Sequence, residues 1–336
     1  MYPIIVLDGP DAVGKTTLAL NIMKKLNNCK YIHCTYRFKD RIFDYHTAVI
    51  KAASKWAQKQ PVIIDRWWPT EACYATVYRK SSSWPLQGRF HERVSLKYGV
   101  IYIMCLPDNS TLSRFEKMKT EREEMYDDIK DLCEMYLKLY YGSEEHKDNG
   151  NYIDQMILSG GMSMVPYYIP YTIERWGSHH DHFIPMILEV SEHMIQQQIK
   201  DALNPNEHNF LGHKKFARYL FVGEQVNPKY KNTFWPFFEY GNCSLYFTQA
   251  LHELWIREHE CAYTNIKDHK GNIDLRFIEE LENEVEIIAM GNIAQDILSK
   301  ENIEFNSIKH PQYYRRFNGK GYEQITNDIK EALWSA

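Results

Sequence analysis

Short apolar runs alternate along the chain with segments whose apolar side chains recur every three or four positions. In the first part of the chain, the runs that predict buried strands are 4–7, 31–36, 61–65 and 100–106. The segments after the first two runs predict helices, and the first helix carries Leu18, Ile22 and Leu26 on one face. Strands that alternate with helices form a parallel sheet covered on both faces. The carboxyl ends of such strands meet at one edge, where we expect the active site.

The same alternation resumes beyond residue 218. Here the predicted strands are 219–222, 262–266, 286–290 and 304–308, with helices between them. A helix predicted over 184–203 is broken by the polar sequence Asn204-Pro205-Asn206-Glu207. We therefore predict two three-layer α/β domains, residues 1–204 and residues 205–336.

Composition narrows the class of protein. The chain has 336 residues, 44% hydrophobic and 25% charged, which suffices for sizeable cores. A net charge of -4 excludes a uniformly basic nucleic-acid binder, although local basic patches remain compatible. The seven cysteines form no C-x-x-C pair, as is typical of reduced thiols in a cytosol-like compartment. No apolar stretch reaches membrane-spanning length and the N-terminus leads directly into a strand, so we expect a soluble cytoplasmic protein.

The strongest motif follows the first predicted strand. Residues 9–16 spell G-x-x-x-x-G-K-T and lead into the first helix, which is the context of a phosphate-binding loop. Gly9 and Gly14 let backbone N–H groups point at phosphate oxygens, Lys15 reaches the β/γ-phosphates and the Thr16 hydroxyl binds Mg²⁺. The residues expected to bind ATP are Gly9, Asp11, Ala12, Val13, Gly14, Lys15, Thr16 and Thr17.

A second motif comes directly after the strand at 61–65. Asp65 at the strand end is a candidate Mg²⁺ ligand, and Arg66 can clamp an acceptor phosphate in bidentate fashion. Trp67 and Tyr74 offer flat faces for a base. The loop alone does not separate kinases from ATPases and GTPases, but this second motif favours a kinase with an acceptor site.

Both motifs resemble those of thymidylate kinase and its deoxynucleoside kinase relatives. The loop of that family is matched by Asp8, Gly9, Asp11, Gly14, Lys15, Thr16 and Thr17, and its Asp-Arg-aromatic motif by Asp65, Arg66, Trp67, Thr70 and Tyr74. The resemblance implies that Asp11 faces the acceptor sugar, that Arg66 binds the acceptor phosphate and that a mobile lid supplies further arginines.

Three further arginines enter through this resemblance. Arg114 and Arg122 lie where the lid is expected, and because position 12 is Ala, a lid arginine such as Arg122 has to neutralise transition-state charge. A solvated helix face with i,i+4 ion pairs is an equal alternative for both. Arg37 follows the second strand, where the family often has Arg-Glu-Pro-Gly. Arg37 can keep the contact with the acceptor phosphate, but the departure leaves open an acceptor other than plain dTMP.

The catalytic set expected from motifs and resemblance together is Lys15, Asp11, Arg66, Arg122 and Asp8. Transfer to a phosphate needs little acid–base chemistry, because positioning and charge neutralisation carry it. Transfer to a hydroxyl requires a carboxylate base, and Asp8 and Asp11 are the nearest candidates.

The strand ends of the second half are similar to motifs of the uracil-DNA glycosylase superfamily. The matching positions of a base site are Glu224, Asn227, Asn265 and His310. The resemblance implies that Asn265 reads a pyrimidine edge and that His310 stabilises charge on a leaving base. The first of these motifs, which runs from Gly223-Glu224 to Asn227-Pro228, is one residue longer than the usual forms, and Gln312 replaces the Ser of the family's final His-Pro-Ser loop. We therefore expect pyrimidine or DNA recognition with weak or no glycosylase activity.

Two other clusters have competing interpretations. Residues 313–317 interleave aromatic and basic side chains, which suits DNA, but a surface loop with half-buried tyrosines is the alternative. His179, His180, Asp181 and His182 invite a metal interpretation, but helix capping is favoured since no second ligand cluster matches.

These features predict ATP- and Mg²⁺-dependent phosphoryl transfer to a pyrimidine deoxynucleoside monophosphate, either dTMP or a 5-modified dUMP. The alternatives are a kinase acting on a 5-hydroxymethyl pyrimidine within DNA, by analogy with bacteriophage DNA modification, and an active glycosylase fused to a kinase. The expected partners are ATP, the deoxynucleotide and, through the C-terminal domain, DNA. No membrane partner is expected, and a homodimer is an expectation from the kinase family alone.

Overall fold

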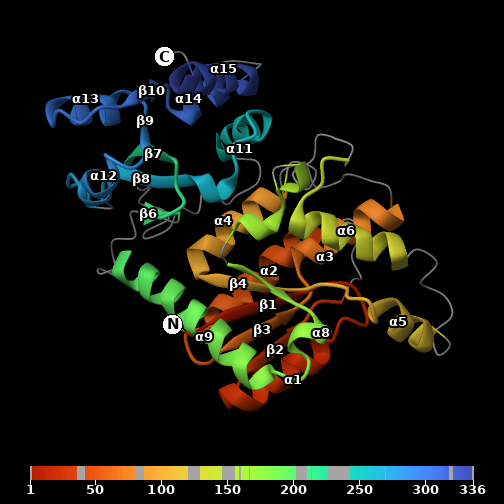
Figure 1. Ribbon diagram of the computed structural model, residues 1–336. Helices are drawn as coiled ribbons and strands as arrows, with labels where there is room; N and C mark the ends of the chain where they lie inside the picture. The colour runs from red at the N-terminus through yellow and green to blue at the C-terminus, as the bar shows by residue number, and fades with distance from the viewer. Residues whose placement is uncertain are drawn as a thin grey trace. The chain divides into compact units, whose positions relative to one another are not determined.

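The structure is a computed structural model that describes residues 2–35, 42–79, 87–119, 129–145, 156–158, 160–165, 167–201, 210–212, 214–225, 243–268, 270–317 and 321–334. It divides into two compact units, each with its own sheet (Figure 1). The N-terminal unit comprises Met1–His91 and Tyr98–Gln197, and the C-terminal unit comprises Glu92–Lys97 and Gln198–Ala336. Nothing in the sequence pattern indicates that Glu92–Lys97 belongs with the second unit. The predicted boundary after residue 204 stays a prediction.

The N-terminal unit is built on a five-stranded parallel sheet with strand order β2-β3-β1-β4-β5. Its strands are β1 (Ile4–Asp8), β2 (Lys30–His33), β3 (Val62–Asp65), β4 (Val100–Cys105) and β5 (Tyr168–Tyr171). Strands β1, β3 and β4 are buried throughout, as a sheet covered on both faces requires. The α/β class is therefore confirmed, and β5 is an additional strand that the apolar pattern did not reveal.

Strand register brings the expected chemistry to one edge of this sheet. Leu7 pairs with Asp65 across β1 and β3, and His33 pairs with Asp65 across β2 and β3. The helices of this unit are α1 (Lys15–Leu26), α2 (Ile42–Trp56), α3 (Trp68–Tyr74), α4 (Gln87–Tyr98), α5 (Thr111–Lys119), α6 (Ile129–Tyr141), α8 (Ile173–Trp176) and α9 (His180–Asp201). Residues 92–97 of α4 are counted with the C-terminal unit. The carboxyl ends of β1, β2 and β3 are the edge at which α/β sheets bind ligands.

The C-terminal unit holds a second five-stranded sheet with strand order β10-β9-β7-β8-β6. Its strands are β6 (Phe210–Leu211), β7 (Tyr219–Gln225), β8 (Cys261–Lys267), β9 (Glu286–Met290) and β10 (Asn306–Ile308). The four longer strands run parallel, while β6 pairs antiparallel with β8, so this sheet is mixed. Four of the five strands correspond to predicted strands.

Helices and strands of the C-terminal unit share one apolar core. The helices are α11 (Cys243–Glu253), α12 (Arg276–Leu281), α13 (Asn292–Lys300), α14 (Pro311–Phe317) and α15 (Gly321–Trp334). Side chains of β7, β8 and β9, such as Leu220 and Ile287, pack with Ile278 of α12 and Leu298 of α13. Helix α14 corrects the alternative of a surface loop at 313–317: Pro311 occupies its first position, where a missing N–H costs nothing.

Candidate nucleotide-binding site

The phosphate-binding loop has the geometry that its two glycines predict. Gly9 follows β1 with φ of +150°, and a Cβ there would collide with the backbone oxygen of Cys105. Gly14 precedes α1 with φ of +83°, and its Cβ would lie 3.0 Å from the side chain of Ile173. Positive φ and close approach together require glycine at both positions. The backbone of the loop therefore curls between β1 and the N-terminus of α1, as phosphate binding requires.

Lys15 folds back over this loop. Its Nζ donates to the carbonyl oxygen of Gly9 at 2.8 Å and also to that of Pro10. The side chain is 7% exposed, and desolvation by burial, followed by the nearby charge of Arg66, lowers the pKa of Lys15. Two carbonyl oxygens thus hold the amine where phosphate oxygens are expected to replace them.

Arg66, Asp11 and Tyr74 form one cluster above the loop. The Arg66 guanidinium donates to Asp11 and to the Tyr74 hydroxyl, the latter at 3.1 Å, and lies over the Tyr74 ring. Burial alone would lower the pKa of Arg66, but Tyr74 and Asp11 outweigh it and keep the guanidinium charged. Arg66 has φ of +66°, a strained conformation for a side chain of this kind.

Asp8 is a positioning residue in this geometry. It is fully buried, and its carboxylate accepts from the Trp67 N–H at 3.0 Å, from Thr70 Oγ1 at 2.7 Å and from the Tyr136 hydroxyl at 3.0 Å. Desolvation raises the pKa of Asp8. Since these bonds tie β1 to the start of α3 and to α6, Asp8 is poorly placed to act as a base. Tyr136 is a contributor that sequence reasoning missed.

Trp67 departs from its expected role. The ring is fully buried, donates from Nε1 to the His46 carbonyl oxygen at 3.1 Å and stacks with Tyr102. It is part of the pocket wall, yet a ring with no exposed area offers no flat face to a base. Of the two aromatic residues expected there, Tyr74 lines the pocket and contacts Arg66.

Asp65 has one oxygen occupied and one available. Its Oδ2 accepts from the Tyr31 hydroxyl and contacts Nδ1 of His33 at 3.0 Å. Its Oδ1 is buried and has no hydrogen-bond partner among the residues that the structure describes. A buried carboxylate oxygen in the same pocket as the Thr16 hydroxyl fits the hard-oxygen preference of Mg²⁺. His33 and Tyr31 were not singled out from the sequence, although both lie in the second predicted strand.

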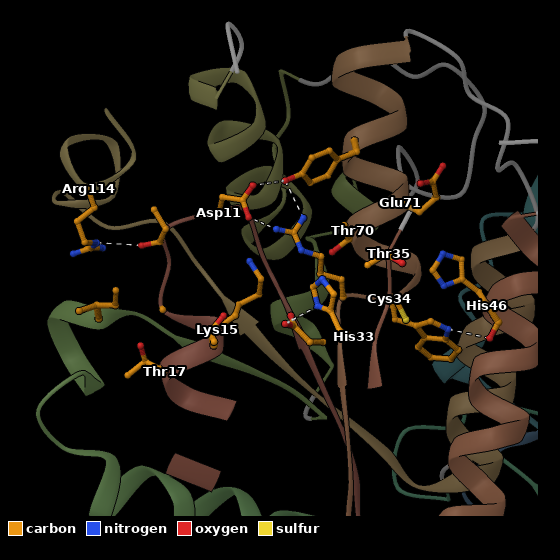
Figure 2. A pocket seen from close by; sticks show the side chains of 18 of the residues that line it. Asp11, Lys15, Thr17, His33, Cys34, Thr35, His46, Thr70, Glu71 and Arg114 are labelled. Atoms are coloured by element: carbon orange, nitrogen blue, oxygen red, sulfur yellow. Dashed lines mark hydrogen bonds and ion pairs between the residues drawn. The ribbon is translucent and has the colours of Figure 1, made fainter. Parts of the chain in front are cut away.

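One pocket of about 870 Å³ within the N-terminal unit is lined by members of these clusters, among them Lys15, Asp65, Arg66 and Tyr74. Figure 2 shows this pocket from close by. Arg114 of α5 closes one side: its guanidinium donates to the Ala12 carbonyl oxygen at 3.1 Å and to Asp108 at 2.7 Å. The structure thus places this arginine of the expected lid beside the loop. Arg37 and Arg122 lie outside the described residues. Val13 is buried behind the loop and Thr17 lines the pocket.

In the C-terminal unit, two residues expected in the base site, Asn265 and His310, lie toward the carboxyl ends of β8 and β10, which β7 and β9 separate in the sheet. Gly223 of β7 pairs with Asn265 of β8, and a Cβ on Gly223 would come to 2.5 Å from the Asn265 Oδ1. His310 follows β10 and lies against Gly291, while its Nδ1 accepts the Gln312 N–H at 3.2 Å. An acceptor role at Nδ1 places the proton of the neutral ring on Nε2.

The other expected residues of that unit have simple placements. Glu224 follows Gly223 near the end of β7 and is half-buried, and Asn227 lies outside the described residues.

In the N-terminal unit, the imidazole of His180 is hydrogen-bonded to the side chains of Asn21 and Tyr171, at 2.8 and 2.9 Å. No group of three or more His, Cys, Asp or Glu side chains in the described chain is placed to hold a metal. Nor does this part of the chain contain a helix long and apolar enough to cross a membrane.

Fold and loop together define the class: an α/β protein whose parallel sheet carries a P-loop at its carboxyl edge. No family model and no curated protein sequence matches the chain. Among solved structures it is similar to the YorR protein of Bacillus subtilis in complex with phosphorylated GDP, with 19% identity and a TM-score of 0.39 over 56% of this chain and 95% of that one. It is also similar to a putative polyphosphate kinase 2 of Pseudomonas aeruginosa, with 10% identity and a TM-score of 0.33 over 98% and 84% of the two chains.

Proposed function

We propose that the protein is a kinase that transfers the γ-phosphoryl group of ATP to the phosphate of a pyrimidine deoxynucleoside monophosphate such as dTMP or a 5-modified dUMP. The observation that carries this proposal is the presence of two anion-binding elements in one pocket. Lys15 and the loop suit the donor phosphates, and Arg66 adds a second cationic group close enough to shift the pKa of Lys15. An ATPase or GTPase binds one set of phosphates, whereas a kinase that acts on a monophosphate has to hold a second phosphate as well, and Arg66 beside the loop suits that acceptor phosphate.

Phosphoryl transfer depends mainly on the positions of the two substrates and on neutralisation of their negative charge. The loop N–H groups and Lys15 hold the β- and γ-phosphates, and Arg66 exchanges Asp11 for the acceptor phosphate. Asp11 is then available for a sugar hydroxyl of the acceptor. Thr16 and Asp65 would hold Mg²⁺, which would supply positive charge to the transferring phosphoryl group. No general base is required, which agrees with the burial of Asp8.

Transfer of labelled γ-phosphate tests the proposal. Free dTMP, dUMP and 5-hydroxymethyl-dUMP are offered as acceptors, alongside oligonucleotides that contain thymine or 5-hydroxymethyluracil. We expect label on a free monophosphate, abolished by Lys15→Met and weakened through acceptor KM by Arg66→Ala. Label that appears only as inorganic phosphate would refute the kinase.

A second candidate is a kinase that acts on a modified pyrimidine within DNA, with the C-terminal unit recognising the base. The observation that favours it is the pair of side chains, Asn265 and His310, set against glycines at adjacent strand ends. Label only on the oligonucleotide, with steep salt dependence and loss in Asn265→Ala, would select it. Point variants are preferable to deletion of residues 205–336, because Arg93 is buried against Glu258 and would lose its partner.

A further inference from the structure

One end of the pocket carries a buried carboxylate that the transfer chemistry does not use. Glu71 of α3 is 2% exposed and lines the pocket together with Thr35 and His46. Figure 2 shows these residues on the side opposite Arg114 and Thr17, with Lys15 between the two ends. The phosphates belong near the loop, so the end with Glu71 is left for the base of the acceptor.

Helix α3 holds this carboxylate in a fixed place. The preceding residue, Thr70, donates to Asp8 at 2.7 Å, and the Glu71 N–H donates to the Trp67 carbonyl oxygen at 3.3 Å. Trp67 is in turn anchored through its own N–H to Asp8 at 3.0 Å. Because Trp67, just before α3, and Thr70, within it, are tied to the buried end of β1, the Glu71 side chain is suited to discriminate between ligands rather than to adapt to them.

The charges of the pocket are distributed unevenly. Lys15, Arg66 and Arg114 lie toward the loop, whereas the imidazole beside Glu71 is neutral at pH 7, since burial lowers the pKa of His46 to about 3. His91 contacts both His46 and Trp67, and burial likewise lowers its pKa far below the ordinary value. In its ionised form, a carboxylate at this end of the pocket is an acceptor only, so it favours a base that presents N–H donors.

We propose that Glu71 is a specificity-determining residue that accepts a hydrogen bond from the exocyclic amine of the acceptor base. This inference rests on the proposed phosphoryl transfer to a pyrimidine deoxynucleoside monophosphate, and it replaces dTMP and 5-modified dUMP by dCMP as the expected acceptor. Cytosine presents an N4 amine where uracil and thymine present the O4 oxygen, whose lone pairs would face a carboxylate at that position, while the N3–H donor of uracil and thymine lies one ring atom away. Among pyrimidines, Glu71 therefore favours dCMP or a 5-modified dCMP over dTMP and dUMP. Adenine and guanine, like cytosine, also carry an exocyclic amine on the edge that pairs in nucleic acids.

The test compares kcat/KM for dCMP and dUMP, which differ in the exocyclic group that Glu71 is proposed to read and in the proton that uracil carries on N3. The wild type is expected to prefer dCMP. Glu71→Gln, which can also donate to O4, is expected to lower the dCMP-to-dUMP ratio by about tenfold to a hundredfold. Glu189→Gln, an exposed glutamate of α9, is the matched control and should leave the ratio unchanged.

Each outcome decides something different. A wild type that prefers dUMP or dTMP overturns the inference and leaves the kinase standing, and so does an unchanged ratio in Glu71→Gln. Preference for dAMP or dGMP over dCMP supports amine recognition and overturns the pyrimidine class. If no monophosphate is phosphorylated, the kinase proposal fails. The inference about Glu71 is then tested separately by the rise in Tm on adding dCMP or dUMP: a larger rise with dCMP supports it, and an equal or smaller rise overturns it. The wild-type comparison holds even if Glu71→Gln does not fold.

Discussion

The ion pair between Arg93 and Glu258 gives a stability prediction that can be worked out from its contacts. Both side chains are completely buried, and the pair is bidentate, with Nε to Oε1 at 2.6 Å and Nη2 to Oε2 at 3.1 Å. The Tyr263 hydroxyl donates to the same carboxylate at 2.8 Å, and Arg93 also donates to Thr248 at 3.2 Å. Burial alone would lower the pKa of Arg93, but Glu258 raises it above its ordinary value.

Glu258→Ala leaves the guanidinium buried without its counter-charge. Removing one partner of such a pair costs about 3–5 kcal/mol, well beyond the loss of one neutral hydrogen bond. The double variant Arg93→Met with Glu258→Leu removes both charges and is expected to recover most of this loss. Glu284→Ala, an exposed glutamate of the same unit, is the control and should change stability by less than about 0.5 kcal/mol.

Hydrogen exchange of the β7 and β8 amides is the appropriate assay, because it reports the opening of the C-terminal unit by itself. A chain with two compact units need not unfold in one step, so a single global midpoint is not sufficient. A loss in Glu258→Ala below about 1 kcal/mol would refute the reasoning, as would a double variant no more stable than the single one.

Four further predictions concern the N-terminal unit. Lys15→Met should lower kcat for transfer by about a hundredfold or more while thermal unfolding is retained, because the amine supplies charge to the transferring phosphoryl group. Asp65→Asn should raise the Mg²⁺ concentration needed for half-maximal activity, and an unchanged Mg²⁺ titration would remove Asp65 from the metal site. Gly14→Ala should weaken ATP binding, measured by equilibrium dialysis, because φ of +83° disfavours any side chain there. Burial lowers the pKa of His46 from 6.5 to about 3, so the folded protein binds this proton less well than the unfolded chain. Its contribution to stability is complete above pH 6.5 and is lost toward pH 3 at about 1.4 kcal/mol per pH unit; urea unfolding of His46→Leu should show a shallower pH slope.

Local sequence was enough for the elements that depend on local rules. The apolar runs around Ile4–Asp8, Val62–Asp65 and Val100–Cys105 predicted central strands, because a strand covered on both faces has to be apolar throughout. Likewise the spacing of Gly9, Gly14 and Lys15 predicted a phosphate-binding loop, since only glycine tolerates these backbone angles. Strand β5, with its sequence Tyr-Ile-Pro-Tyr, was missed because it is short and contains proline.

Tertiary structure alone decided which side chains meet. Asp8 and Asp65 are both acids at strand ends, and the sequence offers no means of telling them apart. In the fold, Tyr136 from far along the chain saturates Asp8, whereas one oxygen of Asp65 stays available to a ligand. Trp67 was expected to hold a base and is instead buried against Tyr102.

The same holds for Arg93: its segment, Glu92–Lys97, belongs to the C-terminal unit although the chain before and after this segment belongs to the N-terminal one. The spacing of a motif reflects the backbone conformation that neighbouring residues must adopt, so it can be recognised from the sequence alone. Burial and charge pairing depend on residues brought together from distant parts of the chain, and no local pattern encodes them. The sequence by itself therefore determined the loop and the class of sheet, while the fold decided which carboxylates position the site and which are left to bind a ligand.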